Sequence, residues 1–136
     1  MKKRNLLTGI LLLILIAIIL IFLKINKSHG NVASEKTDIH ISAEKLYSDF
    51  KNDENKANEM YLDKVIEVSG NIATVSKQSS QYIILLDVTS TGGINCLMLD
   101  DSSAIAQLKP AGDITIKGKC TGFLMDVNLN DCVLIK

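Results

Sequence analysis

The sequence predicts a mainly β domain, a small five-stranded barrel preceded by one or two short helices, that follows a single N-terminal hydrophobic helix. An uncharged run of leucine and isoleucine near the N-terminus predicts the hydrophobic helix. Alternating apolar and polar residues from about residue 65 onward, broken by turn-forming residues, predict the barrel. The expected segments are a basic N-terminus (1–5), a transmembrane helix (6–23), a linker (24–41) and the folded domain (42–136).

The hydrophobic run extends from Leu6 to Leu23 and contains no charged residue. At about 1.5 Å per residue it would be about 27 Å long, close to the roughly 30 Å hydrocarbon core of a bilayer. A signal peptide usually has a shorter apolar region of about 7–15 residues that ends in small residues. Here Lys24 follows the run directly. We therefore expect an uncleaved membrane anchor, with a domain secreted after cleavage as the alternative.

The basic residues around this run predict its orientation. Three of them, Lys2, Lys3 and Arg4, precede the run, whereas only Lys24 and Lys27 closely follow it. Basic residues are enriched on the cytoplasmic side of membrane helices. The expected arrangement is a single-pass protein with a cytoplasmic N-terminus and an extracytoplasmic domain.

A helical period begins after Ser42, a residue type that is favoured as an N-cap. Its apolar residues are spaced i, i+3, i+4 and i+7, and they are Ala43, Leu46, Tyr47 and Phe50. The pattern is interrupted at Asn52 and Asp53 and resumes with Ala57, Met60 and Tyr61. One or two short helices are therefore expected, with both tyrosines in the core rather than in a binding site.

The period from Val65 onward is that of strands. The predicted strands are 65–75, 81–88, 94–99, 114–121 and 127–135, with a short helix over 102–108. Five strands with a helix between the third and fourth are the element order of an OB-fold, a small Greek-key barrel. Gly70 and Gly118 lie inside strand patterns, where glycine usually marks a bulge or a tight corner. An open meander with helices on one face is the alternative architecture.

Several motifs resemble the tRNA_anti-like family of bacterial OB-fold domains. They are Ala57 and Tyr61 followed by Lys64–Ile72, then Ile94–Cys96, Gly112–Gly122 and Leu129–Ile135. The resemblance covers about residues 43–135, and strands like Gly112–Gly118, which begin with Gly-Asp and end with glycine, are shared by many OB-folds. It implies the fold rather than a ligand, and it implies a secreted or membrane-anchored protein.

The charge of the predicted barrel argues against nucleic acid. Residues 65–136 carry five lysines, seven acidic residues and no arginine. Binding of single strands requires a positive groove and aromatic rings on which bases stack. The only aromatic residues of this segment are Tyr82 and Phe123. Nucleic-acid binding therefore remains an alternative that rests on analogy with other OB-folds.

The sequence contains no motif that predicts catalysis. There is no Gly-x-Ser-x-Gly, no glycine-rich phosphate loop and no His-Glu-x-x-His. The cysteines and histidines are not clustered as zinc ligands would be. We expect a protein that is not an enzyme and needs no cofactor or metal. Its expected partners are the membrane and an unidentified protein, glycan or small ligand.

Two sets of residues are candidates for special roles. Cys120 and Cys132 flank a predicted hairpin and could form a disulfide in an oxidising compartment, and the alternative is that they and Cys96 are three buried thiols. The hairpin tip is unusually apolar and two lysines share one face of the strand before it, so the candidate interaction surface is Phe123, Leu124, Met125, Lys117 and Lys119. Alternatively, the tip folds back over the end of the barrel.

Overall fold

The computed structural model describes residues 12–20, 32–37, 39–90, 92–99 and 103–135. The chain divides into two compact units, Met1–Gly30 and Asn31–Lys136. In the first unit, residues 12–20 are helical. No helix within the described residues is both long enough and apolar enough to cross a membrane. The other residues of the predicted segment 6–23 lie outside the described part of the chain.

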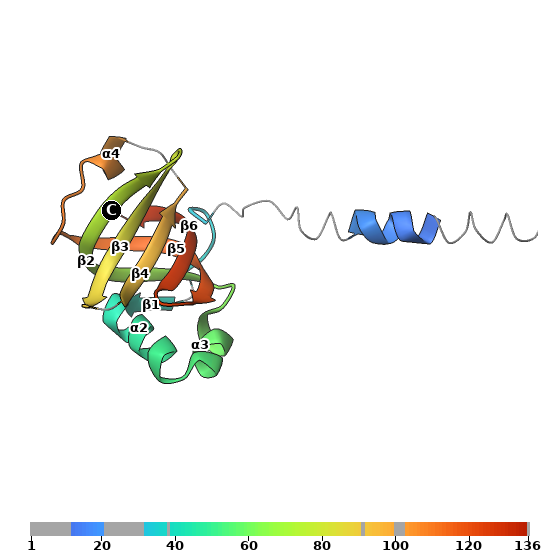
Figure 1. The fold of residues 1–136 in the computed structure, drawn as a ribbon, viewed down its shortest axis with the longest axis horizontal. Coiled ribbons are helices and arrows are strands. Elements are labelled where there is room, and N and C mark those ends of the chain that lie inside the picture. Colours follow the sequence, from blue (N-terminus) through green and yellow to red (C-terminus); the bar gives the residue numbers. More distant parts are fainter. Residues whose placement is uncertain (1–11, 21–31, 38, 91, 100–102, 136) are drawn as a thin grey trace, which may run out of the picture. The chain divides into compact units, whose positions relative to one another are not determined.

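The second unit is a closed barrel of five strands (Figure 1). The strands are β2 (Val65–Gln78), β3 (Gln81–Thr89), β4 (Gly92–Met98), β5 (Asp113–Phe123) and β6 (Val127–Ile135). Their neighbour order is β2–β3–β4–β6–β5, and β5 pairs with β2 to close the barrel. The pairing of β4 with β6 is parallel and the other four are antiparallel. This topology confirms the OB-fold-like barrel and excludes the open meander.

Side chains alternate between the inside and the outside of each strand, and the inward ones form the core. Along β3 and β4, Ile84, Leu86, Ile94 and Met98 are fully buried. Burying an aliphatic side chain of this size contributes about 1.5–3 kcal/mol. The core therefore holds the strands in a fixed register, and this register decides which residues point outward.

The two short helices that the sequence predicts before the barrel cover one of its ends (Figure 1). In α2 (Ala43–Asn52), the side chain of Ser42 accepts a hydrogen bond of 3.2 Å from the Lys45 amide. In α3 (Glu54–Tyr61), Asp53 caps in the same way, with 3.1 Å to the Lys56 amide. A short helix, α4 (Ser103–Ala106), lies at the opposite end and buries Ile105.

Within the predicted linker 24–41, the described residues 32–37 and 39–41 belong to the domain, which corrects the prediction for them, and residues 24–31 lie outside the described part of the chain. β1 (Ile39–Ser42) pairs in parallel with β2, with Ile39 opposite Ile66 and Ser42 opposite Ser69. Val32 is only 1% exposed. Ile39 and Ile41 of this segment pack against the hydrophobic core of the domain. We call residues 32–37 together with β1 the covering segment.

Candidate functional site on the outer surface of the barrel

The outward side chains in the middle of β3 and β4 form an uncharged strip, which ends at the exposed Asp87 of β3. Ile83 lies opposite Leu97 in the register, and Leu85 lies opposite Asn95. On the next strand Asn128 lies opposite Asn95, and the Asn95 Nδ2 donates a hydrogen bond of 3.2 Å to the Asn128 Oδ1. All five side chains are half-buried. We call them the neutral face.

The surface remains uncharged where it continues onto β2. Thr74 lies opposite Leu85, and Ser76 lies opposite Ile83. Both are exposed and add hydroxyl groups beside the apolar side chains. A strip across four strands thus offers apolar contact area together with amide and hydroxyl groups. This mixture is typical of ligand-binding surfaces, where apolar contacts provide affinity and a few polar groups fix orientation.

A shallow pocket lies where the neutral face meets the turn between β3 and β4. It is lined by Leu85, Leu86, Asp87, Thr89, Ser90, Gly92, Gly93 and Asp126. The Gly93 amide donates a hydrogen bond of 2.8 Å to the Asp126 Oδ1. A Cβ atom at position 93 would lie 2.1 Å from the Leu86 carbonyl oxygen, so only glycine allows this close approach of the strands. Backbone atoms therefore form part of the pocket wall.

The apolar hairpin tip adjoins this pocket, because Asp126 belongs to both. Leu124 and Met125 are 86% and 72% exposed. Phe123 instead folds back over the barrel end, where its ring centroid lies 5.8 Å from those of both Tyr47 and Phe50. The structure therefore splits the predicted tip: Phe123 packs into the domain, whereas Leu124 and Met125 remain available for contact.

Lys117 does not belong to an exposed surface, contrary to the prediction. Its side chain is 6% exposed and its Nζ donates a hydrogen bond to the Glu35 carbonyl oxygen in the covering segment. Opposite it on β2, Glu67 accepts a hydrogen bond of 2.6 Å from the Thr37 hydroxyl and lies 2.8 Å from the His40 Nδ1. The covering segment is thus bonded to both charged side chains, Lys117 and Glu67.

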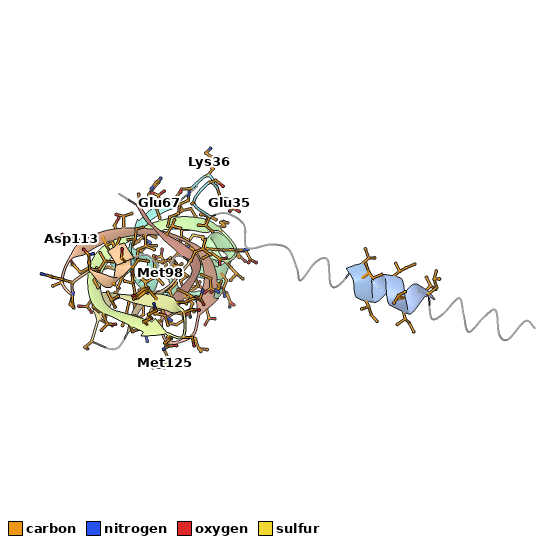
Figure 2. All side chains as sticks on the ribbon, turned by 90° about the horizontal axis from the view of Figure 1, so that it is seen from above. Glu35, Lys36, Glu67, Met98, Asp113 and Met125 are labelled. Atoms are coloured by element: carbon orange, nitrogen blue, oxygen red, sulfur yellow. The ribbon has the colours of Figure 1, made fainter. Side chains whose placement is uncertain are left out.

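Lys119, the other predicted lysine, is partly available. Its Nζ lies 3.3 Å from the Asp63 Oδ1, and 41% of its side chain is exposed. Figure 2 shows Glu35, Lys36 and Glu67 on one side of the domain and Met125 on the other. Lys117, which lies opposite Glu67, therefore does not form one surface with Met125 of the hairpin tip.

The three cysteines are free and buried in the structure. The Cys132 thiol donates a hydrogen bond of 3.4 Å to the Leu129 carbonyl oxygen. The neighbouring Cys96 and burial together raise the pKa of Cys132 well above its ordinary value. Burial also raises the pKa of Cys120. The predicted pair, Cys120 and Cys132, is not joined in the structure.

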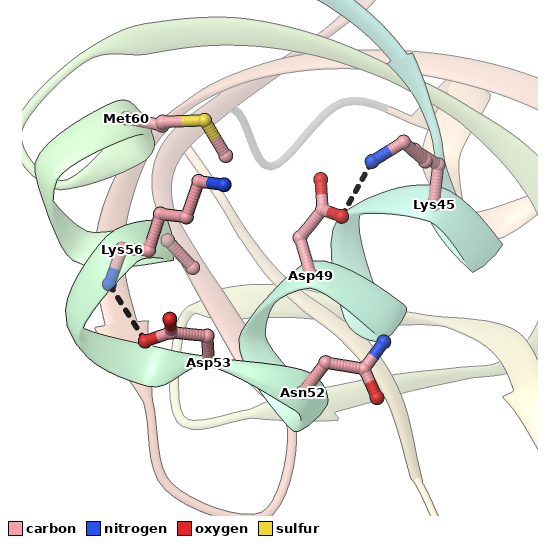
Figure 3. A pocket seen from close by; sticks show the side chains of 7 residues that line it. Lys45, Asp49, Asn52, Asp53, Lys56 and Met60 are labelled. Atoms are coloured by element: carbon pink, nitrogen blue, oxygen red, sulfur yellow. Dashed lines mark hydrogen bonds and ion pairs between the residues drawn. The ribbon is translucent and has the colours of Figure 1, made fainter.

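A second pocket lies between α2 and α3 (Figure 3). It is lined by Lys45, Asp49, Asn52, Asp53, Lys56, Ala57 and Met60. Asp49 forms an ion pair with Lys45 and accepts a hydrogen bond of 2.7 Å from the Tyr61 hydroxyl. Burial and this contact with Asp49 raise the pKa of Tyr61 to about 12. The carboxylates of this pocket are engaged in holding the two helices together, so it is a weaker candidate for a binding site.

The sequence matches the family model described as tRNA_anti-like over residues 1–133. The chain belongs to the tRNA_anti-like family. Among curated proteins, none matches the sequence significantly. A solved structure that resembles this family member is that of a lipoprotein from Klebsiella pneumoniae subsp. pneumoniae MGH 78578, to which nucleic-acid binding is attributed. The alignment has 18% identity and a TM-score of 0.60, and it covers 82% of this chain and all of the other. This likeness shows that the two share a fold.

Two weaker structural matches cover about half of the chain. The Stn1–Ten1 complex of Schizosaccharomyces pombe aligns with 16% identity and a TM-score of 0.43, over 53% of this chain and 58% of the other. The OBody AM3L09, bound to hen egg-white lysozyme, aligns with 12% identity and a TM-score of 0.40, over 57% and 86%.

Proposed function

We propose that this protein is a membrane-anchored binding module whose OB-fold domain lies outside the cytoplasm and holds an uncharged, partly apolar polypeptide segment on the neutral face. One observation carries the proposal: none of the five residues of the neutral face is charged. Apolar side chains beside amide groups complement an extended polypeptide, which presents both apolar side chains and main-chain hydrogen-bonding groups.

The side chains of the neutral face favour a binding role over catalysis. Ile83, Leu85 and Leu97 would lose their remaining contact with water when a ligand covers them, which is a favourable change. The amides of Asn95 and Asn128 bond to each other and keep further donor and acceptor capacity for a ligand. None of these five residues is a nucleophile or a general base, so the surface is suited to holding a ligand rather than changing it.

The anchored, extracytoplasmic placement rests on the N-terminal segment. The run from Leu6 to Leu23 is uncharged, and basic residues precede it. The described apolar side chains of residues 12–20 are all exposed, which suits a lipid environment. A domain released after signal-peptide cleavage would keep the same binding surface, so the two placements differ in anchoring rather than in ligand.

Single-stranded nucleic acid is the second candidate ligand. It is favoured by the fold shared with the Klebsiella lipoprotein, to which nucleic-acid binding is attributed. Lys77 lies 4.7 Å from the centre of the Tyr82 ring, so one cation and one ring occur together at one end of β3. Affinity for nucleic acid grows with the number of phosphates that cations neutralise. A single lysine beside one ring falls short of the groove that this mode requires.

A peptide selection tests the ligand class directly. A displayed library of random peptides is selected against the purified domain, and each enriched peptide is measured against two variants. Leu85→Asp places a charge on the neutral face, whereas Ile135→Asp places one at an exposed site opposite Thr115. We expect at least tenfold weaker binding to Leu85→Asp and unchanged binding to Ile135→Asp. Equal affinity for both variants would refute the site.

Labelled single-stranded oligonucleotides, measured by fluorescence anisotropy between about 50 and 300 mM salt, supply the comparison with the second candidate. We expect no saturable binding. Micromolar binding that weakens steeply with salt would replace the proposal with nucleic-acid binding.

Protease added to spheroplasts tests the placement of the domain. We expect the domain to be degraded, and full protection would place it in the cytoplasm.

A further inference from the structure

The shallow pocket beside the neutral face lies in line with the outward side chains of β3 and β4. In the register of these strands, Leu85 lies opposite Asn95. Asp87 and Gly93 form the next outward pair. Alternate residues of a strand are about 7 Å apart, so the pocket begins one pair beyond the neutral face. We call it the Gly93 pocket.

The pocket exists because Gly93 has no side chain. A Cβ atom at this position would lie 2.1 Å from the Leu86 carbonyl oxygen, so no other residue fits there. The resulting hollow has a volume of about 290 Å³. This is close to the lower end of the range of ligand-binding pockets, roughly 300–1,000 Å³. The outer surface of the barrel thus has a recess at the end of an uncharged strip.

A carboxylate lies on each side of this recess. β4 has β3 on one side, where Asp87 lies opposite Gly93, and β6 on the other. Asp126 directly precedes β6, and its Oδ1 accepts a hydrogen bond of 2.8 Å from the Gly93 amide. Among the described residues, no lysine or histidine forms an ion pair with either carboxylate.

The lining of the Gly93 pocket is apolar as well as acidic. Leu85 and Leu86 line it together with the two carboxylates. The side chains of lysine and arginine have the same two parts, because an aliphatic stem packs against apolar groups while the cationic end bonds to carboxylates. The pocket is therefore complementary in charge and in polarity to a basic side chain.

We propose that the Gly93 pocket receives a lysine or arginine side chain of the polypeptide that the neutral face holds. The inference rests on the proposed function and narrows it, because a basic residue adjoins the uncharged segment of the ligand. Alternate side chains of an extended chain point the same way and recur about every 7 Å, the spacing of the outward pairs of β3 and β4. The basic residue should therefore lie two positions from an apolar residue that contacts Leu85 and Asn95.

The two carboxylates would act mainly on the choice of ligand. Complementary charges at an interface contribute more to specificity than to affinity. Asp87 and Asp126 attract a basic residue and repel an acidic residue or a phosphate group. The neutral face would thus provide the contact area, and the pocket would select among polypeptides with similar apolar segments.

Two displayed peptide libraries, one with and one without lysine and arginine, test the inference by selection against the full chain in detergent. We expect the library with basic residues to supply the peptides that bind less tightly to Leu85→Asp. These peptides should share a basic residue two positions from an apolar one. Replacing that residue with methionine should weaken binding about fivefold, the effect of a partly exposed ion pair.

Variants of single carboxylates locate the basic residue on the protein. Asp87→Asn and Asp126→Asn remove the charge and keep an oxygen that accepts hydrogen bonds. The control is Asp113→Asn, at an exposed carboxylate opposite Asn71 and outside the neutral face. We expect about fivefold weaker binding of the basic peptides to the first two variants and unchanged binding to the control. The methionine-containing peptides should not distinguish the three variants.

The outcomes separate this inference from the proposed function. Peptides that depend on Leu85 but bind equally well without a basic residue would overturn the inference and leave the proposed function intact. Peptides that bind equally to Leu85→Asp would overturn both. Binding that requires added Ca²⁺ and is abolished by a chelator would assign the two carboxylates to a metal ion and overturn the inference.

Discussion

Two outer surfaces of the same barrel differ in whether another segment of the chain covers them. The surface of β2 and β5 carries charged side chains, Glu67 and Lys117, and the covering segment lies over it. The surface of β3, β4 and β6 carries the neutral face, and no described segment of the chain is bonded over it. Another segment of the chain thus covers one surface, whereas no segment among the described residues is bonded over the other.

The covering segment also changes how Lys117 and Lys119 of β5 are interpreted. Two lysines on one strand of an OB-fold could contribute to a positive groove that binds nucleic acid. Here, however, Lys117 is hydrogen-bonded within the domain and Lys119 lies close to Asp63. None of the five residues of the neutral face offers a cation to a phosphate. The comparison therefore predicts that changes under the covering segment alter stability, and that changes on the neutral face alter binding.

Removing the covering segment should have the largest effect on stability. A chain that begins at Ser42 lacks Val32, Ile39 and Ile41 and leaves the charged groups of the covered surface uncovered. The lost burial amounts to about 3–5 kcal/mol, which lowers the melting temperature by roughly 15 °C or more in a domain of this size. A chain that begins at Asn31 is the control, and equal melting temperatures for the two would show that the segment is a linker after all.

Lys117→Met and Lys119→Met form a matched pair on one strand. Lys117→Met removes the hydrogen bond to the Glu35 carbonyl from a buried position, at a cost of about 1.5–3 kcal/mol. Lys119→Met removes an exposed ion pair, which typically contributes less than about 1 kcal/mol. Urea unfolding of both variants measures the difference. Equal losses would contradict the contrast between a covered and an open lysine.

The contact between α2 and α3 provides a stability comparison that involves neither the covered surface nor the neutral face. Tyr61 has a pKa of about 12 in the folded protein, against an ordinary value of 10.0, because burial and the neighbouring Asp49 disfavour its ionised form. A folded-state pKa above the unfolded one gives stability that is complete below about pH 10 and is lost as the pH rises toward about 12. Tyr61→Phe should cost about 1 kcal/mol at neutral pH.

The pH dependence of this variant provides its own check. The phenylalanine that replaces Tyr61 cannot ionise, so the difference in unfolding free energy between the two proteins should narrow between about pH 10 and 12. Denaturant unfolding across this window measures it, with the lysines titrating equally in both proteins. A constant difference would mean that the hydroxyl of Tyr61 is not held by Asp49.

The neutral face should give the smallest effect on stability. Leu97→Ser removes a half-buried side chain that points away from the core, so we expect a loss of less than about 1 kcal/mol in urea unfolding. Ligand binding should fall far more than stability does. A loss of stability above about 2 kcal/mol would indicate that Leu97 belongs to the core instead of an open surface.

The sequence predicts the barrel strands and helix caps because each depends on a local pattern. Ser42 and Asp53 cap the helices that the apolar spacing indicates. β1 was missed because four residues with only two apolar positions, Ile39 and Ile41, are too few to show a strand period. Its pairing depends on β2, which is distant in the sequence.

Long-range contacts also explain what could not be predicted about the surface. Alternation along β5 correctly places Lys117 on the outside, but the residue that covers it, Glu35, is 82 positions away. The run from Ile83 to Leu86 is apolar on both sides of its strand, so no period distinguishes the outward residues. The neutral face can be recognised only when the register of β3 and β4 is known.

Photocrosslinking in intact cells tests the central claim, that the neutral face holds polypeptide. A photoreactive amino acid replaces Leu97 in one protein and Ile135 in a second, which serves as the control outside the neutral face. We predict adducts from position 97 that are destroyed by protease, resist nuclease and have discrete masses, with few from position 135. Nuclease-sensitive adducts at position 97, or the same protein adducts from both positions, would contradict the claim.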